Sequence, residues 1–317
     1  MARRLGFEIE PPITNASGPE SETYERLIRI ARSSVGAVIT KSMTHCPRTG
    51  NPEPRLKHLD RDLGSLNSMG LPNLGYRAYA EMMSDLKGFG KPVIASIATA
   101  PCSHGLSPVE QYGEIAEALT ESGADLLELN LSCPNLEAIP IAMDPQSVRE
   151  MLEAVKTRVT VPISVKLPPY NNVPWIFEAV ADVLIDLGVE CVSTMNSEPN
   201  TMEIDLETMT QAIRPRQGYG GLGGRAVLPI ALAEVHRCYT YFRQQDYDML
   251  IFGVGGITEP EDAIKHHLAG ADIVQIGTAY LTQGPEVFER IAVGVERWLE
   301  AHDFRNVSEI VGTVRDL

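Results

Sequence analysis

Cys133 stands between Asn130 and Asn135 in the stretch "LELNLSCPNLE" (residues 127–137), directly after a run of apolar residues. A partly ionised thiol can act as a base or a nucleophile, and amide groups both donate and accept hydrogen bonds. Most free cysteines are instead small buried hydrophobic residues. Cys102, in "APCSHG", also follows an apolar run. The residues alone do not decide between these two thiols.

Polar residues or glycines also follow most of the other apolar runs, at the points where predicted strands end. A single polar residue at the end of a strand is usually just exposed to solvent. Many such residues together indicate a shared site if the strands lie parallel in a barrel. These residues are Asn15, Ser17, Lys41, Ser42, Asn130, Ser132, Cys133, Asn135, Lys166, Asn196, Ser197, Gly255, Gly256, Gly277 and Thr278.

Three glycine-rich stretches predict a phosphate site: "GYGGLGG" (218–224), "GVGGI" (253–257) and "QIGTA" (275–279). Glycine lets backbone N–H groups approach an anion, and a helix N-terminus adds a favourable dipole. A phosphorylated cofactor is therefore expected. Lys166, at a strand end, would place a cation beside an electron-rich ring, which suits flavin mononucleotide (FMN).

The elements that must position these residues follow from the pattern of apolar runs. Strands are predicted near 12–17, 36–41, 92–97, 125–130, 161–166, 190–195, 249–254 and 272–276, and helices at 108–122, 145–158, 174–188, 259–269 and 285–300, among others. Near-continuous apolar strands that alternate with helices indicate a parallel sheet covered on both sides.

Eight such units in 317 residues favour an α/β fold, a (β/α)8 TIM barrel, as a single domain over residues 1–317. A doubly wound sheet is the rival, but no G-x-G-x-x-G follows the first strand. The connections 43–75 and 197–224 are too long for turns, which predicts long inserted loops at the C-terminal face of the barrel.

The composition excludes several classes of function. A net charge of −15 argues against nucleic acid and anionic membranes as partners. The five cysteines are widely spaced without a C-x-x-C pair, which favours a reducing compartment and no metal site. The N-terminus does not read as a signal peptide, and no apolar run is long enough to span a bilayer. A cytoplasmic protein is expected.

Several motifs together resemble the class 1A dihydroorotate dehydrogenases, cytoplasmic FMN-dependent barrels of pyrimidine biosynthesis. They are "TKSMTHCPRTGNPEPR", "GSLNSMGLPNLG", "ELNLSCPN", "VKLPPY", "GYGGLGG", "GGI" and "QIGTA", in order from about residue 13 to 290. "NSMGLPNLG" favours class 1A over class 1B. The resemblance implies oxidation of (S)-dihydroorotate to orotate, with hydride transfer to FMN. A homodimer that reoxidises its flavin with fumarate or another soluble acceptor is also implied.

The resemblance also implies a role for particular residues. Cys133 would be the general base and Lys41 would lie between flavin and substrate. The substrate would contact Lys41, Asn67, Met69, Gly70, Leu71, Asn130, Asn135, Asn196 and Ser197. The FMN would contact Ala16, Ser17, Gly18, Lys41, Ser42, Asn130, Lys166, Gly223, Gly224, Gly255, Gly256, Gly277 and Thr278. The resemblance selects Cys133 over Cys102, and Cys46, Cys191 and Cys238 are interpreted as structural or incidental.

Two stretches depart from the family pattern. After Asn135 the chain reads "LEAIPIAMDPQ", without the glycine and lysine of the family's mobile loop, and "EPNTMEID" follows Ser197 in place of a glycine-containing stretch. A carboxylate at Glu198 that faced the pocket would repel a substrate carboxylate. The alternative substrate is an uncharged dihydropyrimidine. Two alternative functions are a flavin subunit that passes electrons to a partner, as in class 1B or dihydropyrimidine dehydrogenase-like systems, and a non-catalytic flavin-binding barrel.

Overall fold

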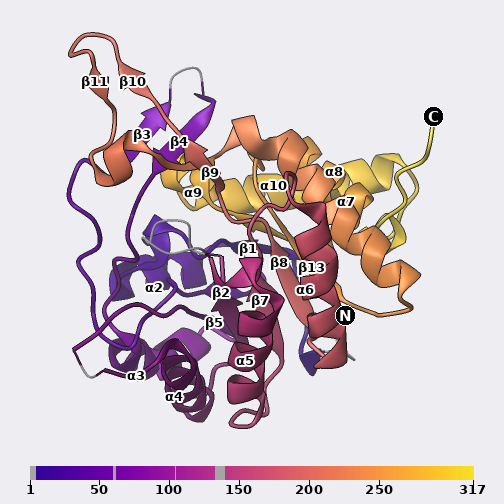
Figure 1. The fold of residues 1–317 in the computed structure, drawn as a ribbon. Coiled ribbons are helices and arrows are strands. Elements are labelled where there is room, and N and C mark those ends of the chain that lie inside the picture. The colour runs from indigo at the N-terminus through magenta and orange to yellow at the C-terminus, as the bar shows by residue number, and fades with distance from the viewer. Residues whose placement is uncertain (1–4, 60–61, 104, 133–139) are drawn as a thin grey trace.

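A barrel of eight parallel strands forms the centre of the computed structural model, which describes residues 5–59, 62–103, 105–132 and 140–317 (Figure 1). The strands follow the order β1-β14-β13-β8-β7-β6-β5-β2. Their bounds are β1 Ile13–Asn15, β2 Val38–Ile39, β5 Val93–Ile97, β6 Leu126–Asn130, β7 Ile163–Lys166, β8 Cys191–Thr194, β13 Leu250–Val254 and β14 Ile273–Ile276. All eight predicted strands are present, and the prediction of a TIM barrel is confirmed.

Asn15 completes the closure of the barrel between β1 and β2. These two strands share one backbone bridge, between Thr14 and Ala37. Beyond it, the Asn15 side chain donates from Nδ2 to the Ile39 carbonyl at 2.7 Å and accepts from the Ile39 N–H at 2.9 Å. A side-chain amide thus takes the place of a ladder hydrogen bond, which satisfies buried backbone groups at the seam.

Helices pack around the outside of the strands (Figure 1). They are α2 Tyr24–Arg32, α3 Tyr76–Lys87, α4 Pro108–Glu121, α5 Pro145–Lys156, α6 Pro174–Asp186, α7 Leu228–Gln244, α8 Pro260–Ala269, α9 Thr278–Gln283 and α10 Glu286–Ala301. Short 3-10 helices span Pro19–Ser21, Ile141–Met143, Pro215–Gly218, Arg225–Val227 and Val307–Glu309. The predicted helices near 108, 145, 174, 259 and 285 are all confirmed.

Helix α5 shows how the sequence determines such an element. The Asp144 side chain accepts a hydrogen bond from the Ser147 N–H and caps the helix, and Pro145 occupies the first turn. Its apolar stripe is buried against the barrel: Val148, Met151, Leu152 and Val155. On the neighbouring strand β6, Leu127 and Leu129 face the helices, while Leu126 belongs to the separate cluster inside the barrel.

The two long connections fold into antiparallel strands above the carboxyl ends of the barrel strands. β3 (Leu56–Leu59), β4 (Gly64–Asn67), β12 (Gly220–Gly223) and β9 (Glu198–Thr201) form one sheet in that order. β10 (Ile204–Asp205) and β11 (Thr210–Gln211) form a hairpin that projects from the molecule (Figure 1). The prediction placed long loops here and did not foresee their strands.

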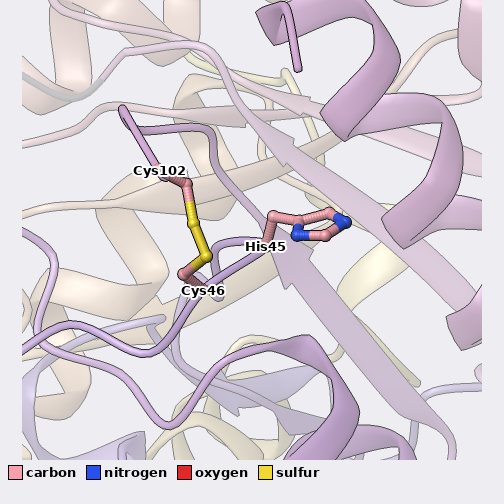
Figure 2. A group of neighbouring side chains, drawn as sticks. All are labelled: His45, Cys46 and Cys102. Carbon is pink, nitrogen blue, oxygen red and sulfur yellow. A yellow bond between two sulfur atoms is a disulfide. The ribbon is translucent and has the colours of Figure 1, made fainter. Parts of the chain in front are cut away.

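Cys46 and Cys102 are joined by a disulfide, with their Cα atoms 6.2 Å apart (Figure 2). Because 56 positions separate them in the chain, only the folded barrel brings them together. This pairing is consistent with the interpretation of Cys46 as structural, and Cys102, the rival to Cys133, is not a free base in this form. Cys191 and Cys238 are buried and take no part in a disulfide. Within the described residues, no helix is both long and apolar enough to cross a bilayer.

Candidate active site

One cavity opens at the carboxyl ends of the barrel strands, under the sheet formed by the long connections. Most residues predicted for the site line it: Ala16, Ser17, Gly18, Lys41, Ser42, Asn67, Met69, Leu71, Asn130, Lys166, Asn196, Ser197, Gly223, Gly224, Gly255, Gly256, Gly277 and Thr278. Gly70 does not, because it packs against Asn51, whose side chain a Cβ would meet at 2.3 Å. Cys133 and Asn135 lie outside the described residues.

The cavity also contains residues that the sequence analysis did not name individually, although some lie in the motifs it quoted: Pro19, Leu56, Ser65, Met195, Val227, Val254, Ile257, Gln275 and Leu281. Leu56 and Ser65 come from β3 and β4, so they reach the cavity only because the long connection folds back over the barrel. Gln275 points inward from β14, and alternation of side chains along that strand was the available signal.

The amide of Asn130 is held by hydroxyl groups on both of its polar atoms. Its Nδ2 donates to Ser42 Oγ at 2.9 Å, and its Oδ1 accepts from Ser132 Oγ at 3.0 Å. Ser42 Oγ also lies 3.0 Å from Ser17 Oγ and from Ser96 Oγ. An amide fixed in this way presents a defined edge to a ligand, since its rotation would break two buried hydrogen bonds.

Glu128 forms the centre of a buried polar network below the cavity. Its carboxylate accepts hydrogen bonds from Ser96 Oγ at 3.0 Å and Ser193 Oγ at 2.7 Å. It also accepts one from Gln275 Nε2 at 3.3 Å. A buried carboxylate requires several donors to offset the loss of hydration, and these three supply them. Through Ser96 and Ser42 the network continues to Asn130, so the cavity floor is one connected hydrogen-bonded unit.

Two further asparagines and a serine also line the cavity, namely Asn67, Asn196 and Ser197. Asn67 Nδ2 donates to the Gly221 carbonyl at 3.0 Å. Asn196 Nδ2 donates to Ser132 Oγ at 2.9 Å, and Asn196 Oδ1 accepts from the Ser197 N–H at 2.8 Å. Amides from β4, from the end of β6 and from the end of β8 therefore converge on one space, as a flat ligand with several donors and acceptors requires.

Lys41 and Lys166 bring two buried cations to the same cavity; each is 5% exposed. The ammonium group of Lys166 makes no hydrogen bond or ion pair with any described residue. A buried ammonium is costly unless an anion or strong acceptors surround it. The cavity is therefore prepared for a ligand that carries negative charge or electron-rich atoms next to Lys166.

The glycine-rich loops after β13 and β14 form the other end of the cavity. Gly256 has a φ of 78°, and a Cβ there would lie 2.4 Å from Leu228 Cβ, so only glycine fits. The backbone N–H groups of Gly256, Ile257 and Gly277 make no hydrogen bond within the described part of the chain. Unpaired N–H groups that line a cavity are ready donors for a phosphate.

His266 on α8 supports the first of these loops. Its ring lies 2.9 Å, through Nε2, from the Gly255 carbonyl, and because a carbonyl only accepts, Nε2 carries the proton. Burial lowers the pKa of His266 to about 4, so the ring is neutral at pH 7. The loop is thus held by a neutral donor from outside the cavity, and no extra charge is placed beside the phosphate site.

Glu198, the residue that departs from the family pattern, does not line the cavity. It begins β9, where the Asn171 side chain hydrogen-bonds to its carboxyl group, and burial raises its pKa. The repulsion that a cavity-facing Glu198 would exert on a substrate carboxylate is therefore absent from this geometry.

The fold and the cavity define a class of protein, a TIM-barrel enzyme whose site joins an end lined by glycine-loop N–H groups to an amide-lined pocket. Similar solved structures support that fold. A dihydroorotate dehydrogenase from Eimeria tenella in complex with ferulenol superposes with a TM-score of 0.82, covering 97% of this chain and 86% of that chain at 20% identity. The ligand-free form gives a TM-score of 0.81.

Sequence relatives define the family. The family model for dihydroorotate dehydrogenase matches residues 2–299. The dihydroorotate dehydrogenase (fumarate) of Trypanosoma cruzi is 40% identical, covering 96% of this chain and 95% of its own length. The dihydroorotate dehydrogenase A (fumarate) of Lactococcus lactis subsp. lactis is 37% identical, covering 98% and 97%. The chain belongs to the dihydroorotate dehydrogenase family.

Proposed function

We propose that this protein oxidises (S)-dihydroorotate to orotate with FMN and that fumarate reoxidises its flavin, in pyrimidine biosynthesis. The observation that carries the proposal is one cavity that joins buried Lys166, three convergent asparagines and unpaired backbone N–H groups. The match along nearly the full length of two fumarate-using relatives supports it.

FMN fits the charged and glycine-rich end of the cavity. Gly255, Gly256, Gly277 and Thr278, with Gly223 and Gly224, would hold its phosphate and ribityl chain. Lys166 would lie beside the ring, and Ala16, Ser17, Gly18 and Ser42 would line it. Bound there, FMN supplies a two-electron acceptor, and the cation of Lys166 favours the negative charge of its reduced form.

The amide-lined part of the cavity would hold dihydroorotate. Asn67, Asn130, Asn196 and Ser197 would hydrogen-bond the pyrimidine ring and its carboxylate, together with Asn135. Lys41 would face both flavin and substrate, and Met69 and Leu71 would cover the substrate. Gly70, which packs against Asn51, would set the path of the backbone between those two residues. Amide groups that neighbouring residues hold in place discriminate well between ligands, because a mismatched ligand leaves their hydrogen-bonding atoms unsatisfied.

Cys133 would take the C5 proton of dihydroorotate while hydride leaves C6. It follows Ser132, which is 1% exposed and hydrogen-bonds to both Asn130 and Asn196. The segment that leads to Cys133 is thus fixed to two of the asparagines that would orient the substrate. A thiol with an ordinary pKa of about 8.5 must ionise to act as a base, so the rate should rise towards alkaline pH.

Anaerobic flavin reduction tests this function. The purified protein should be yellow and should bleach when dihydroorotate is added, and fumarate should restore the colour. Cys133→Ala should slow the fast phase by about 100-fold or more, because a general base contributes that much, while orotate binding persists. A flavin that dihydroorotate does not bleach would contradict the proposal and turn attention to uncharged dihydropyrimidines.

We also infer that the chain forms a homodimer. The β10–β11 hairpin and its flanks expose a group of large apolar side chains: Met202, Ile204, Leu206, Met209 and Tyr219. Exposed apolar groups of this kind mark interaction surfaces.

A further inference from the structure

The disulfide between Cys46 and Cys102 joins two connections at the C-terminal face of the barrel. Cys46 lies after β2, and Cys102 lies between β5 and α4. Both residues are half-buried, in contrast to the fully buried thiols of Cys191 and Cys238. This bond is therefore nearer to solvent, and more open to thiol reagents, than Cys191 and Cys238 are.

His45 gives the disulfide a chemically active neighbour. A ring nitrogen of His45 and the two sulfur atoms all lie within 4.8 Å of one another (Figure 2). The same ring is oriented by Glu114 on α4, whose Oε2 is 3.0 Å from Nε2. A histidine beside a cysteine favours the thiolate, and a thiol that leaves as thiolate speeds thiol–disulfide exchange.

A chain of short contacts leads from Cys46 to the wall of the active-site cavity. Thr44 Oγ1 donates to the Cys46 carbonyl at 2.6 Å, and the Thr44 N–H donates to Asn73 Oδ1 at 3.1 Å. Asn73 Nδ2 in turn donates to the Leu71 carbonyl at 2.8 Å. Leu71 lines the cavity, so the position of the Cys46 segment bears on the residues that would cover the substrate.

We propose that Cys46 and Cys102 form a reversible thiol–disulfide exchange site whose partner is a dithiol reductant. In the reduction, the S–S bond breaks and two S–H bonds form. The reductant supplies two electrons and two protons and becomes a disulfide itself. The oxidised form holds residues 44–51 and 98–103 together and keeps Met69 and Leu71 over the cavity. The reduced form releases this restraint, so it binds substrate more weakly.

The first experiment measures which cysteines become accessible to alkylation when the disulfide is reduced. Native protein is alkylated with iodoacetamide before and after treatment with dithiothreitol, and the labelled sites are located by mass spectrometry. Cys46 and Cys102 should be protected before reduction and labelled after it, while the buried Cys191 and Cys238 stay unlabelled in the folded protein. His45→Gln should slow the reduction several-fold, and Ser103→Ala, in the same connection, should not.

The second experiment, which rests on the proposed function, measures KM and kcat for dihydroorotate in oxidised and reduced protein. Reduction should raise KM several-fold with a smaller change in kcat. Cys46→Ser and Cys102→Ser should each show the higher KM and no response to dithiothreitol, and Ser103→Ala should behave as wild type. Equal KM values in the two redox states would overturn the link to the cavity.

Two other outcomes would overturn the exchange site itself. Cys46 and Cys102 could both be labelled in the purified protein before dithiothreitol is added, or the purified chain could carry one zinc ion that is lost from Cys46→Ser. A protein that shows the exchange but does not oxidise dihydroorotate would contradict the proposed function alone, because alkylation does not depend on the reaction.

Discussion

At the scale of single residues, we expect Lys166 to lower the stability of the FMN-free protein and to strengthen FMN binding. Its ammonium is buried without an acceptor among the described residues, so it destabilises the chain until an electron-rich ligand lies beside it. Lys166→Met keeps most of the side-chain volume and removes the charge. We expect the variant without FMN to be more stable by about 1 to 4 kcal/mol, as when buried charges are replaced by apolar groups.

The same substitution should weaken FMN binding by about tenfold or more, since a charge-assisted contact is worth about 1.5–3 kcal/mol. Denaturant unfolding of the FMN-free protein and quenching of FMN fluorescence measure the two effects. Lys57→Met, at an exposed position on β3, is the matched control and should change neither. Loss of stability in the FMN-free Lys166 variant would show that another group already satisfies the ammonium.

Many residues of the cavity could be predicted from the sequence because they belong to strand ends and carry polar or glycine side chains. Lys41, Lys166 and Asn196 are of this kind. Gln275 and Glu128 were missed, since polar residues within an apolar strand look like exceptions until the barrel interior is known. The resemblance placed Gly70 among the substrate contacts, and only the folded structure shows that a side chain at this position would meet Asn51.

At the scale of elements, helix α8 makes the fold sensitive to acid. Burial lowers the pKa of both His266 and His267 to about 4, below their ordinary value of 6.5. Between pH 6.5 and 4 the unfolded chain therefore binds more protons than the folded chain. The free energy of unfolding should fall as the pH drops through this window, by roughly 3 kcal/mol for each ring.

Urea unfolding at several pH values tests this expectation. His267→Asn keeps a side-chain donor and removes one titrating group, so its stability should depend less steeply on pH between 6.5 and 4 by about one proton. His236→Gln, at an exposed position on α7, is the control and should keep the wild-type slope. If His267→Asn and wild type show equal slopes, the buried ring does not titrate on unfolding.

The elements that could be predicted are those with local signals. The barrel strands are continuous apolar runs, and α5 has a cap, a proline and an apolar stripe. β12 reads "GGLG", which has low strand propensity, and it forms because it pairs with β4 and β9 from distant parts of the chain. The disulfide between Cys46 and Cys102 could not be predicted from the sequence for the same reason, since tertiary structure alone brings the two cysteines together.

At the scale of the whole molecule, the net charge of −15 keeps copies of the chain apart unless a specific apolar contact outweighs it. The β10–β11 hairpin offers such a contact. Leu206 and Met209 are each 86% exposed, although apolar side chains of this size are usually buried. In a homodimer these side chains would leave water, and each would contribute about 1.5–3 kcal/mol when fully covered.

Leu206→Glu combined with Met209→Glu should therefore convert the dimer to a monomer, because it places negative charges in an apolar interface of an already acidic protein. Light scattering coupled to size-exclusion chromatography gives the mass directly. Trp175→Glu, which changes a 66% exposed side chain on α6, is the control and should leave the dimer intact. A wild-type mass near 34.7 kDa would show that the hairpin does not join two copies of the chain. If the control dissociates and the hairpin variant does not, the interface lies on the face that carries α6.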